Sequence, residues 1–216
     1  MADVPAWLLR TLIRAPGLLV GITVHEFFHA WTAWKLGDDT PRQMGRVTLN
    51  PFAHLDPLGT LMILFGPFGW GKPVPVNKYN FRDPSRDDMV VAIMGPVSNL
   101  CVAFGFAIVL FLVKQMDLDS TVLLEVAILM GVVINVALMI FNLIPLYPLD
   151  GSHVMEGLLP YEQRESYRAF SRFSPFILLA IILFFGRFLF VPIFTVARLV
   201  LMPFGLQEEL TRLFGA

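Results

Sequence analysis

The stretch MVVAIMGPVSNLCVAFGFAIVLFLV, which runs from Met89 to Val113, contains no charged residue. A helix needs roughly 20 apolar residues to cross a hydrocarbon core of about 30 Å, so this run predicts a transmembrane helix. A second uncharged run extends from Val126 to Leu149 and predicts another. Because proline removes a backbone hydrogen bond and clashes with the preceding turn, Pro145 and Pro148 should end the second helix before its apolar run stops.

The composition of the whole chain agrees with a membrane environment. Of the 216 residues, 56% are hydrophobic and 15% are charged, whereas a soluble domain carries about 25% charged residues. The net charge of −1 provides no concentrated basic surface, so no nucleic-acid partner is expected. Cys101 is the only cysteine, which excludes an intrachain disulfide and a zinc cluster built on thiolates. The expected surroundings are therefore the lipid bilayer.

The first predicted membrane helix covers residues 6–36, and most of its side chains are apolar. Gly37 and the polar residues behind it should end this helix. Arg10 and Arg14 interrupt its first apolar stretch, and no small-residue cleavage site follows. We therefore interpret the segment as a retained helix rather than a signal peptide.

The C-terminal apolar segment, residues 173–206, contains two arginines and allows two interpretations. It could form one span over residues 173–197 with a snorkelling Arg187, or two pieces broken near Pro192. We favour one span followed by an interfacial tail, so that residues 173–216 form a helix and tail. The chain is then an all-α polytopic membrane protein with about four transmembrane helices. These form a single membrane-embedded domain over residues 1–216.

Residues 46–81 have a different character from the helical runs. Proline and glycine recur at short intervals, which makes a continuous helix untenable, although Leu58 to Trp70 is apolar. Irregular apolar backbone at membrane depth is tolerated only where protein shields it or where it lines a cavity. We therefore expect a re-entrant, β-hairpin-like loop beside the active site.

The distribution of positive charge predicts the orientation in the membrane. Lysine and arginine are frequent in segments 35–46, 72–88 and 150–172, whereas the short segment 114–119 contains only Lys114. Because cytoplasmic loops carry an excess of positive charge, the first three segments are expected on the cytoplasmic side.

The sequence HEFFH, from His25 to His29, lies near the end of the first predicted helix. Residues four apart share one face of a helix, so both imidazoles can reach one metal ion. Glu26 is then placed to act as a general base on an attacking water molecule. Histidine and glutamate inside an apolar membrane helix are costly unless they serve a function. The pattern therefore predicts a zinc site, because zinc binds imidazole well and tolerates one open position.

A hydrolytic zinc ion needs a third protein ligand. Asp150 is preferred, since it follows the second uncharged run and precedes Gly151. The prolines at 145 and 148 should turn the chain into an extended segment whose carboxylate points sideways. The other candidates are His54, His153, Glu125, Asp56 and Glu156.

Together these motifs resemble the site-2 protease family of intramembrane zinc metalloproteases. The resemblance covers residues 25–153 in the order of the family. Its motifs are HEFFH (25–29), NPFAHLDPLG (50–59), FGWGKPVPVN (68–77), GPVSN (95–99) and NLIPLYPLDG (142–151). No room exists between the helices for an inserted PDZ domain, so the chain is similar to compact members of the family.

The resemblance implies one zinc ion per chain, held by His25, His29 and Asp150, with Glu26 as the general base. It also places Asn142 near the catalytic centre, as an oxyanion or substrate-backbone partner. It further implies regulated intramembrane proteolysis of a single-span transmembrane protein, in a prokaryotic cytoplasmic membrane, with the active site toward the cytoplasmic side. No feature of the sequence indicates an oligomeric state.

Four residues are candidates for substrate binding. Gly69 and Gly71 permit a close approach of backbone, and the residues around Val74 and Val76 favour an extended chain. We expect this segment to offer an edge to which an unwound substrate adds as a β-strand. A plain proline-rich turn is the alternative.

The remaining candidates and alternatives concern other roles. His54 and Asp56 could line the mouth of the cavity, bind zinc transiently, or cap a loop. A membrane metal-binding or transport protein would use His25 and His29 as a transit site but has no need of the adjacent glutamate. A prenyl-protein-processing type of zinc protease would instead take its third ligand from a glutamate on a later helix, and the candidates are Glu156, Glu162 and Glu165.

Overall fold

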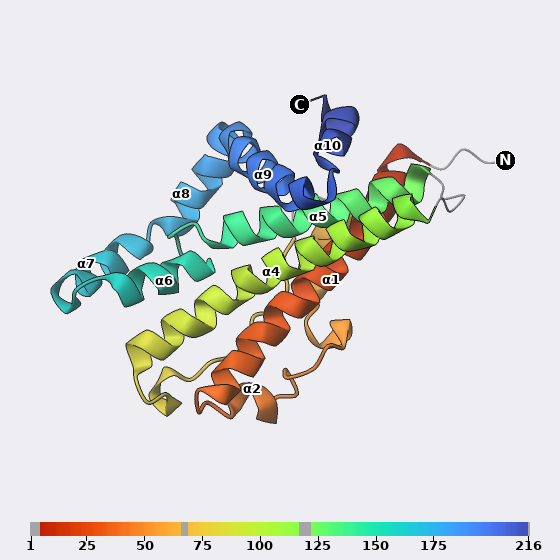
Figure 1. Ribbon diagram of the computed structural model, residues 1–216. Helices are drawn as coiled ribbons and strands as arrows, with labels where there is room; N and C mark the ends of the chain where they lie inside the picture. Colours follow the sequence, from red (N-terminus) through yellow and green to blue (C-terminus); the bar gives the residue numbers. More distant parts are fainter. Residues whose placement is uncertain (1–4, 66–68, 117–121, 216) are drawn as a thin grey trace.

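The computed structural model describes residues 5–65, 69–116 and 122–215, and helices dominate it (Figure 1). The α-helices of the described chain are α1 (Ala6–Lys35), α2 (Thr40–Gln43), α3 (Pro57–Phe65), α4 (Pro84–Gln115), α5 (Val122–Asn142), α6 (Asp150–Leu158), α7 (Tyr161–Ser171), α8 (Ser174–Ala180), α9 (Gly186–Leu201) and α10 (Gln207–Phe214). Single 3-10 turns are η1 (Pro51–Ala53), η2 (Lys78–Asn80) and η4 (Met202–Phe204), and η3 (Ile181–Phe185) is a π-helical turn.

The centre of the molecule is a bundle of α1, α4 and α5, which lie side by side (Figure 1). α1 and α5 cross closely at two glycines, since a Cβ atom at Gly17 would lie 2.7 Å from the Cα atom of Gly131. α9 packs on α4 and α5, and small or branched side chains such as Ala107, Val132 and Ala197 fill the space between these helices. The bundle thus fixes α1, α4 and α5 relative to one another. α1 carries part of the candidate site, and α4 contacts it.

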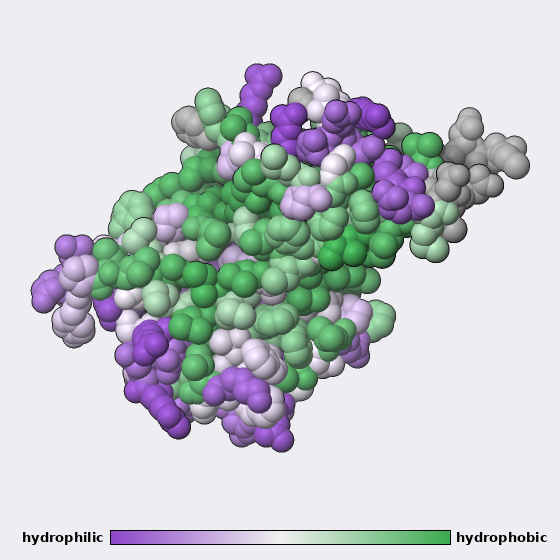
Figure 2. All heavy atoms as spheres, viewed as in Figure 1, coloured by the Kyte–Doolittle hydropathy of each residue, from purple (hydrophilic) through white to green (hydrophobic). Residues whose placement is uncertain are grey.

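Four helices of the described chain are long and apolar enough to cross a membrane, as the sequence predicts. They are α1, α4, α5 and the helix from Gly186 to Phe204. Figure 2 shows hydrophobic side chains over the middle of the bundle and hydrophilic ones gathered toward its two ends. The prediction that α5 ends early is confirmed, because its last residue is Asn142, three positions before Pro145.

The β-hairpin expected within residues 46–81 is not found, and no β-strand occurs in the parts of the chain that the structure describes. The apolar stretch forms α3 instead, where Pro57 suits the first turn and the Asp56 carboxylate accepts a hydrogen bond of 2.7 Å from the Gly59 amide. Strand pairing is reduced to one bridge between Leu55 and Gly71. Local capping therefore favours a short helix over the hairpin.

The C-terminal apolar segment differs from the expected single span over residues 173–197. α8 continues through η3 into α9, and Figure 1 shows the chain changing direction between α8 and α9. The helix that is long and apolar enough to cross a membrane begins only at Gly186. The alternative of a break near Pro192 is also wrong, because that proline lies inside α9. Prolines are tolerated in membrane helices where neighbouring groups satisfy the freed backbone.

Candidate metal centre

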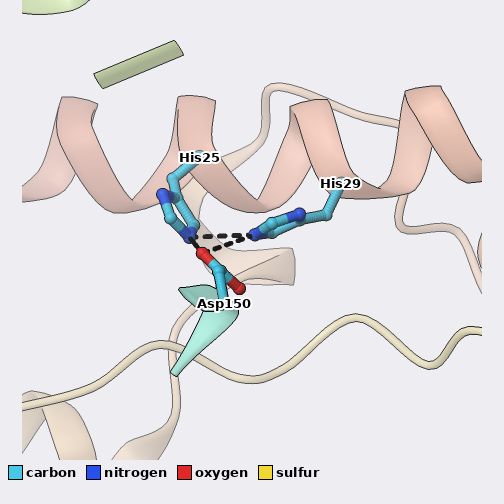
Figure 3. A group of neighbouring side chains, drawn as sticks. All are labelled: His25, His29 and Asp150. Carbon is cyan, nitrogen blue, oxygen red and sulfur yellow. Dashed lines mark hydrogen bonds and ion pairs between the residues drawn. The ribbon is translucent and has the colours of Figure 1, made fainter. Parts of the chain in front are cut away.

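Three side chains converge between α1 and the start of α6 (Figure 3). His25 and His29 stand one helical turn apart on the same face of α1, and their Nε2 atoms are 2.9 Å apart. Asp150 is the first residue of α6, and its Oδ2 atom lies 3.1 Å from His25 Nε2 and 3.3 Å from His29 Nε2. The structure therefore brings together the three residues that the sequence analysis selected as ligands.

Hydrogen bonds from α4 hold both imidazole rings in place. Nδ1 of His29 lies 2.8 Å from the Val91 carbonyl oxygen, and Nδ1 of His25 lies 2.7 Å from Oδ1 of Asn99. A carbonyl oxygen only accepts, so His29 carries its proton on Nδ1 and leaves the lone pair of Nε2 toward the cluster. Both histidines are buried. A helix that carries no ligand of its own thus orients the ligands of α1.

The three converging atoms fit a cation. Oδ2 of Asp150 is buried, and no hydrogen-bond donor from the described chain reaches it. A carboxylate facing two imidazole lone pairs is an unfavourable arrangement unless a positive ion lies among them. Two imidazoles and one carboxylate also match the protein ligands of a catalytic zinc site with one open position.

Gly95 of α4 packs directly against the two imidazoles. A Cβ atom at this position would lie 2.4 Å from Nε2 of His29 and 2.7 Å from Cε1 of His25. Real Cβ atoms do not approach so closely, and the rings are held by their hydrogen bonds, so any larger residue would displace the ligand atoms. Glycine at position 95 is therefore part of the geometry of the metal centre.

Replacing Gly95 with alanine should weaken metal binding on the order of tenfold, the scale of effect known for residues that support metal ligands. The added methyl group would push His29 away from Asp150 while the helix itself persists. Zinc titration against a competing chelator measures the change. Gly105→Ala is the matched control on the same helix, because a Cβ atom there meets nothing within 4 Å. Equal metal affinities of the two variants would contradict the packing argument.

Glu26, the predicted general base, lies beside a buried arginine. Oε2 of Glu26 is 3.9 Å from Nη2 of Arg46. The guanidinium of Arg46 also donates to the carbonyl oxygens of Lys72 and Pro73. A Cβ atom at Gly71 would lie 3.4 Å from Oε1 of Glu26. The segment that begins at Gly71 therefore passes close to the carboxylate of Glu26 and is fastened there by Arg46.

The position of Asp150 depends on the turn between α5 and α6. The sequence analysis expected an extended segment, whereas the structure has a tight turn that leads directly into α6. Gly151 allows this turn, because a Cβ atom there would lie 2.4 Å from the carbonyl oxygen of Leu143. The Tyr167 hydroxyl of α7 donates to the Pro145 carbonyl oxygen at 3.0 Å and fastens the turn.

Three predicted residues stand outside this cluster. The Asn142 amide donates to the Leu138 carbonyl oxygen of its own helix. Asp56 caps α3. His54 is fully buried, with Nε2 donating to the Thr48 carbonyl oxygen at 2.7 Å and Nδ1 facing NH2 of Arg46. Burial lowers the pKa of His54, which agrees with a neutral ring that accepts from the guanidinium.

The predicted substrate-binding residues lie along the segment that follows α3. Gly71 faces α1 beside Ile22, with 2.8 Å between its potential Cβ atom and Cγ2 of Ile22. Val76 packs against a buried cluster that α1 and α4 share, while Val74 is partly exposed. Gly69 lies at the start of the same segment, next to residues 66–68, which are outside the described chain.

Some residues around the site were missed by sequence reasoning. Arg46 lies in no motif, and Gly95 opens the GPVSN motif, but neither has a spacing that ties it to the histidines of α1. Asn99 was assigned no role from the sequence, and its side chain contacts His25. A buried amide in a membrane helix was the available signal, but its partner depends on how α1 and α4 pack.

His153 and Glu156 hold α6 in place rather than joining the cluster. Nδ1 of His153 lies 2.9 Å from Oδ2 of Asp88, which also pairs with Lys78 at 2.7 Å. Glu156 accepts a hydrogen bond from Nε of Arg168 at 2.9 Å. The glutamate that a prenyl-processing type of site would use at position 156 is thus engaged by α7.

Comparisons with known proteins identify the family of the chain. The model of Peptidase family M50 matches residues 118–185. The chain is 41% identical over 160 residues to the Bacillus subtilis (strain 168) protein named "Putative zinc metalloprotease YwhC", a match that covers 69% of this chain and 73% of that protein.

Two mycobacterial proteins with the same description, both named Rip2, also match. The Mycolicibacterium smegmatis protein is 31% identical over 160 residues, covering 71% of this chain and 58% of the relative. The Mycobacterium tuberculosis (strain H37Rv) protein is 28% identical over 174 residues, and the match covers 78% of this chain and 64% of the relative. No solved structure matches the chain significantly. The chain therefore belongs to peptidase family M50, the site-2 protease family, and is a membrane zinc metalloprotease.

Proposed function

We propose that this chain hydrolyses peptide bonds of single-span transmembrane substrates within the membrane, using one zinc ion held by His25, His29 and Asp150. The observation that carries the proposal is the convergence of three acceptor atoms within 4.8 Å of one another, inside a bundle of apolar helices. A transit site for metal does not require a carboxylate next to the ligand pair, whereas Glu26 follows His25 directly.

The depth of the cluster supports cleavage inside the bilayer. His29 precedes the last residue of α1, Lys35, by six positions, which is roughly 9 Å along the helix axis at about 1.5 Å per residue. Trp31 and Trp34 lie between them, and the Lys35 ammonium is 4.4 Å from the centroid of the Trp34 ring. Tryptophan with a neighbouring cation is typical of the membrane–water interface. The candidate site then lies below that interface, in the hydrocarbon region.

The residues of the chain have distinct roles in the proposed reaction. When bound, zinc supplies a Lewis acid that polarises the scissile carbonyl and lowers the pKa of water. Glu26 takes the proton from the attacking water and later donates it to the leaving amine, so the peptide bond and one water molecule become a carboxylic acid and an amine. Arg46 holds a positive charge 3.9 Å from the carboxylate of Glu26. Asn142 remains a proposed partner of the substrate backbone, reached by rotation of its side chain away from Leu138.

Substrate capture is assigned to the segment that Gly69, Gly71, Val74 and Val76 define. Within the described chain, residues 74–76 make no backbone hydrogen bond, whereas their neighbours Lys72 and Asn77 donate to His54 and Asp38. Free backbone groups on an irregular segment beside Glu26 can pair with an unwound substrate. Pairing with a substrate requires only one unpaired backbone edge, so it does not depend on the β-hairpin that the structure lacks in this segment.

The distribution of lysine and arginine supports an orientation of the chain in the membrane. Ten of the 16 lysines and arginines lie in segments 35–46, 72–88 and 150–172, which adjoin the C-terminal end of α1, the N-terminal end of α4 and the start of α6. The positive-inside rule supports an orientation with the cluster toward the cytoplasmic side. The bacterial relatives support a prokaryotic cytoplasmic membrane.

Reconstitution tests the proposal. The purified chain in liposomes, incubated with candidate single-span proteins, should release two fragments whose new ends lie within the span. A chelator should stop the release, and added zinc should restore it. Cleavage that persists after the metal has been removed would contradict the proposed function, as would cleavage confined to soluble loops of every substrate tested.

A further inference from the structure

Two asparagines lie in the interior of the bundle without any exposed surface. Asn99 of α4 and Asn135 of α5 are both 0% exposed. An unpaired amide is costly in such a setting, and a polar residue inside a membrane bundle requires named partners. Their hydrogen bonds form a continuous chain that leads to the candidate metal centre.

Asn135 anchors the far end of this chain. Its Nδ2 donates to the Gly17 carbonyl oxygen of α1 at 3.1 Å and to the Gly131 carbonyl oxygen of α5 at 2.8 Å. Carbonyl oxygens accept and never donate, so the amide of Asn135 has one permitted orientation. Its Oδ1 must then point in the opposite direction, where it accepts from Nδ2 of Asn99 at 3.1 Å.

The orientation of Asn99 follows from that of Asn135. Nδ2 of Asn99 also donates to the Gly21 carbonyl oxygen at 3.1 Å, so both of its protons face acceptors. Oδ1 of Asn99 is left to face Nδ1 of His25 at 2.7 Å. An amide oxygen accepts, so His25 must hold its proton on Nδ1. The lone pair of Nε2 is then directed toward His29 and Asp150.

We propose that Asn135 and Asn99 are positioning residues that fix the proton of His25 on Nδ1 and so keep its Nε2 available to the metal. The proposal rests on the proposed zinc site. His29 needs no such chain, because the Val91 carbonyl oxygen fixes its ring directly. Without the acceptor on Asn135, only the Gly21 carbonyl oxygen holds the amide of Asn99, and an amide that turns over offers its two N–H donors to His25. The ring would then carry its proton on Nε2, where the metal binds.

Asn135→Leu tests this, because leucine has nearly the same shape and removes the acceptor. The full chain in detergent should bind zinc about tenfold more weakly in competition with a chelator, the scale expected for a group that orients a metal ligand. The visible absorption spectrum of the cobalt-substituted protein should change as well. Val132→Ala is the matched control in α5, because it disturbs the same buried core without touching the amide chain.

A rescue separates positioning from a merely structural role. An ionised aspartate at position 99 offers only acceptor oxygens to His25, so it fixes the ring of His25 without help from Asn135. Asn99→Asp combined with Asn135→Leu should therefore restore zinc affinity, although it adds a second unfavourable change to the core. If leucine prevents folding, Asn135→Ala removes the same acceptor with less bulk and serves in its place.

The outcomes are distinct. Weaker binding in the Asn135 variant, with normal binding in Val132→Ala and recovery in the double variant, supports the inference. Zinc affinity that stays unchanged in the Asn135 variant overturns it, and so does a loss that the aspartate does not recover. A wild-type chain that fails to bind zinc would instead overturn the proposed function on which the inference rests.

Discussion

Glu26→Gln should abolish proteolysis while leaving zinc bound. Glutamine has the size and shape of glutamate but no proton affinity, so water activation is lost and the imidazoles keep their positions. A positioned general base contributes about 100-fold to 10,000-fold in rate, and a loss of that size is expected in the rate of substrate cleavage. The measurement pairs this rate, in liposomes with a single-span substrate, with zinc content per chain.

The matched control is Glu125→Gln in α5. Glu125 pairs with Lys114 at 3.1 Å, at the end of α4 away from the cluster, so the same chemical change is made far from the metal. This variant should cleave at the wild-type rate. Wild-type turnover by Glu26→Gln would remove Glu26 from the mechanism, and loss of zinc from that variant would make it a ligand rather than a base.

Asp150→Ala should abolish zinc binding as well as proteolytic activity. Alanine leaves two imidazoles and no carboxylate, which is fewer than the three protein ligands of catalytic zinc sites. Changes among residues that support ligands already cost about 10-fold to 100-fold in affinity, so removing a ligand should cost more than about 100-fold. Chelator competition on the purified variant measures this loss, and circular dichroism checks that the helices remain.

Glu156→Ala provides the comparison that separates two kinds of zinc protease. Glu156 is bound to Arg168 at the surface of α6, so its removal should leave zinc affinity unchanged. If Glu156→Ala lost the metal while Asp150→Ala retained it, the third ligand would be a glutamate on a later helix. The prenyl-processing type of site would then replace the arrangement described above.

The membrane helices could be predicted from the sequence because their signal is local. An uncharged run such as Met89 to Val113 has few other stable conformations in a bilayer, where every backbone group needs an internal partner. Pro145 marks a helix end through its restricted backbone and Gly37 through its freedom to adopt a positive φ, and the structure ends α5 and α1 near them. Local rules therefore account for the C-terminal ends of α1 and α5.

Two parts of the fold could not be predicted in this way. Residues 57–65 read as part of an irregular loop because glycines and prolines surround them, yet the Asp56 cap and Pro57 start a helix. The bend between α8 and α9 falls at a π-helical turn of apolar residues that carry no breaking signal. The bend depends on how α9 packs against α4 and α5, and the sequence of residues 173–206 alone does not reveal that packing.

The same division applies to the candidate site. His25 and His29 are joined by helical spacing, and Asp150 stands out because a proline-rich turn precedes it. Arg46, Gly95 and the chain from Asn135 to His25 depend instead on contacts between helices distant in sequence. Their roles became visible only from distances between side chains of different helices.

The central claim is that two imidazoles and one carboxylate of this chain hold a single zinc ion. X-ray absorption spectroscopy of the purified, zinc-loaded protein tests it most directly. The account predicts one zinc per chain, with two imidazole nitrogens at about 2.0–2.1 Å and a carboxylate oxygen at about 2.0–2.2 Å. The contribution of the carboxylate should disappear from the spectrum of any zinc left in Asp150→Ala. A shell with three or more imidazoles, or a spectrum that the Asp150 substitution leaves unchanged, would contradict the account.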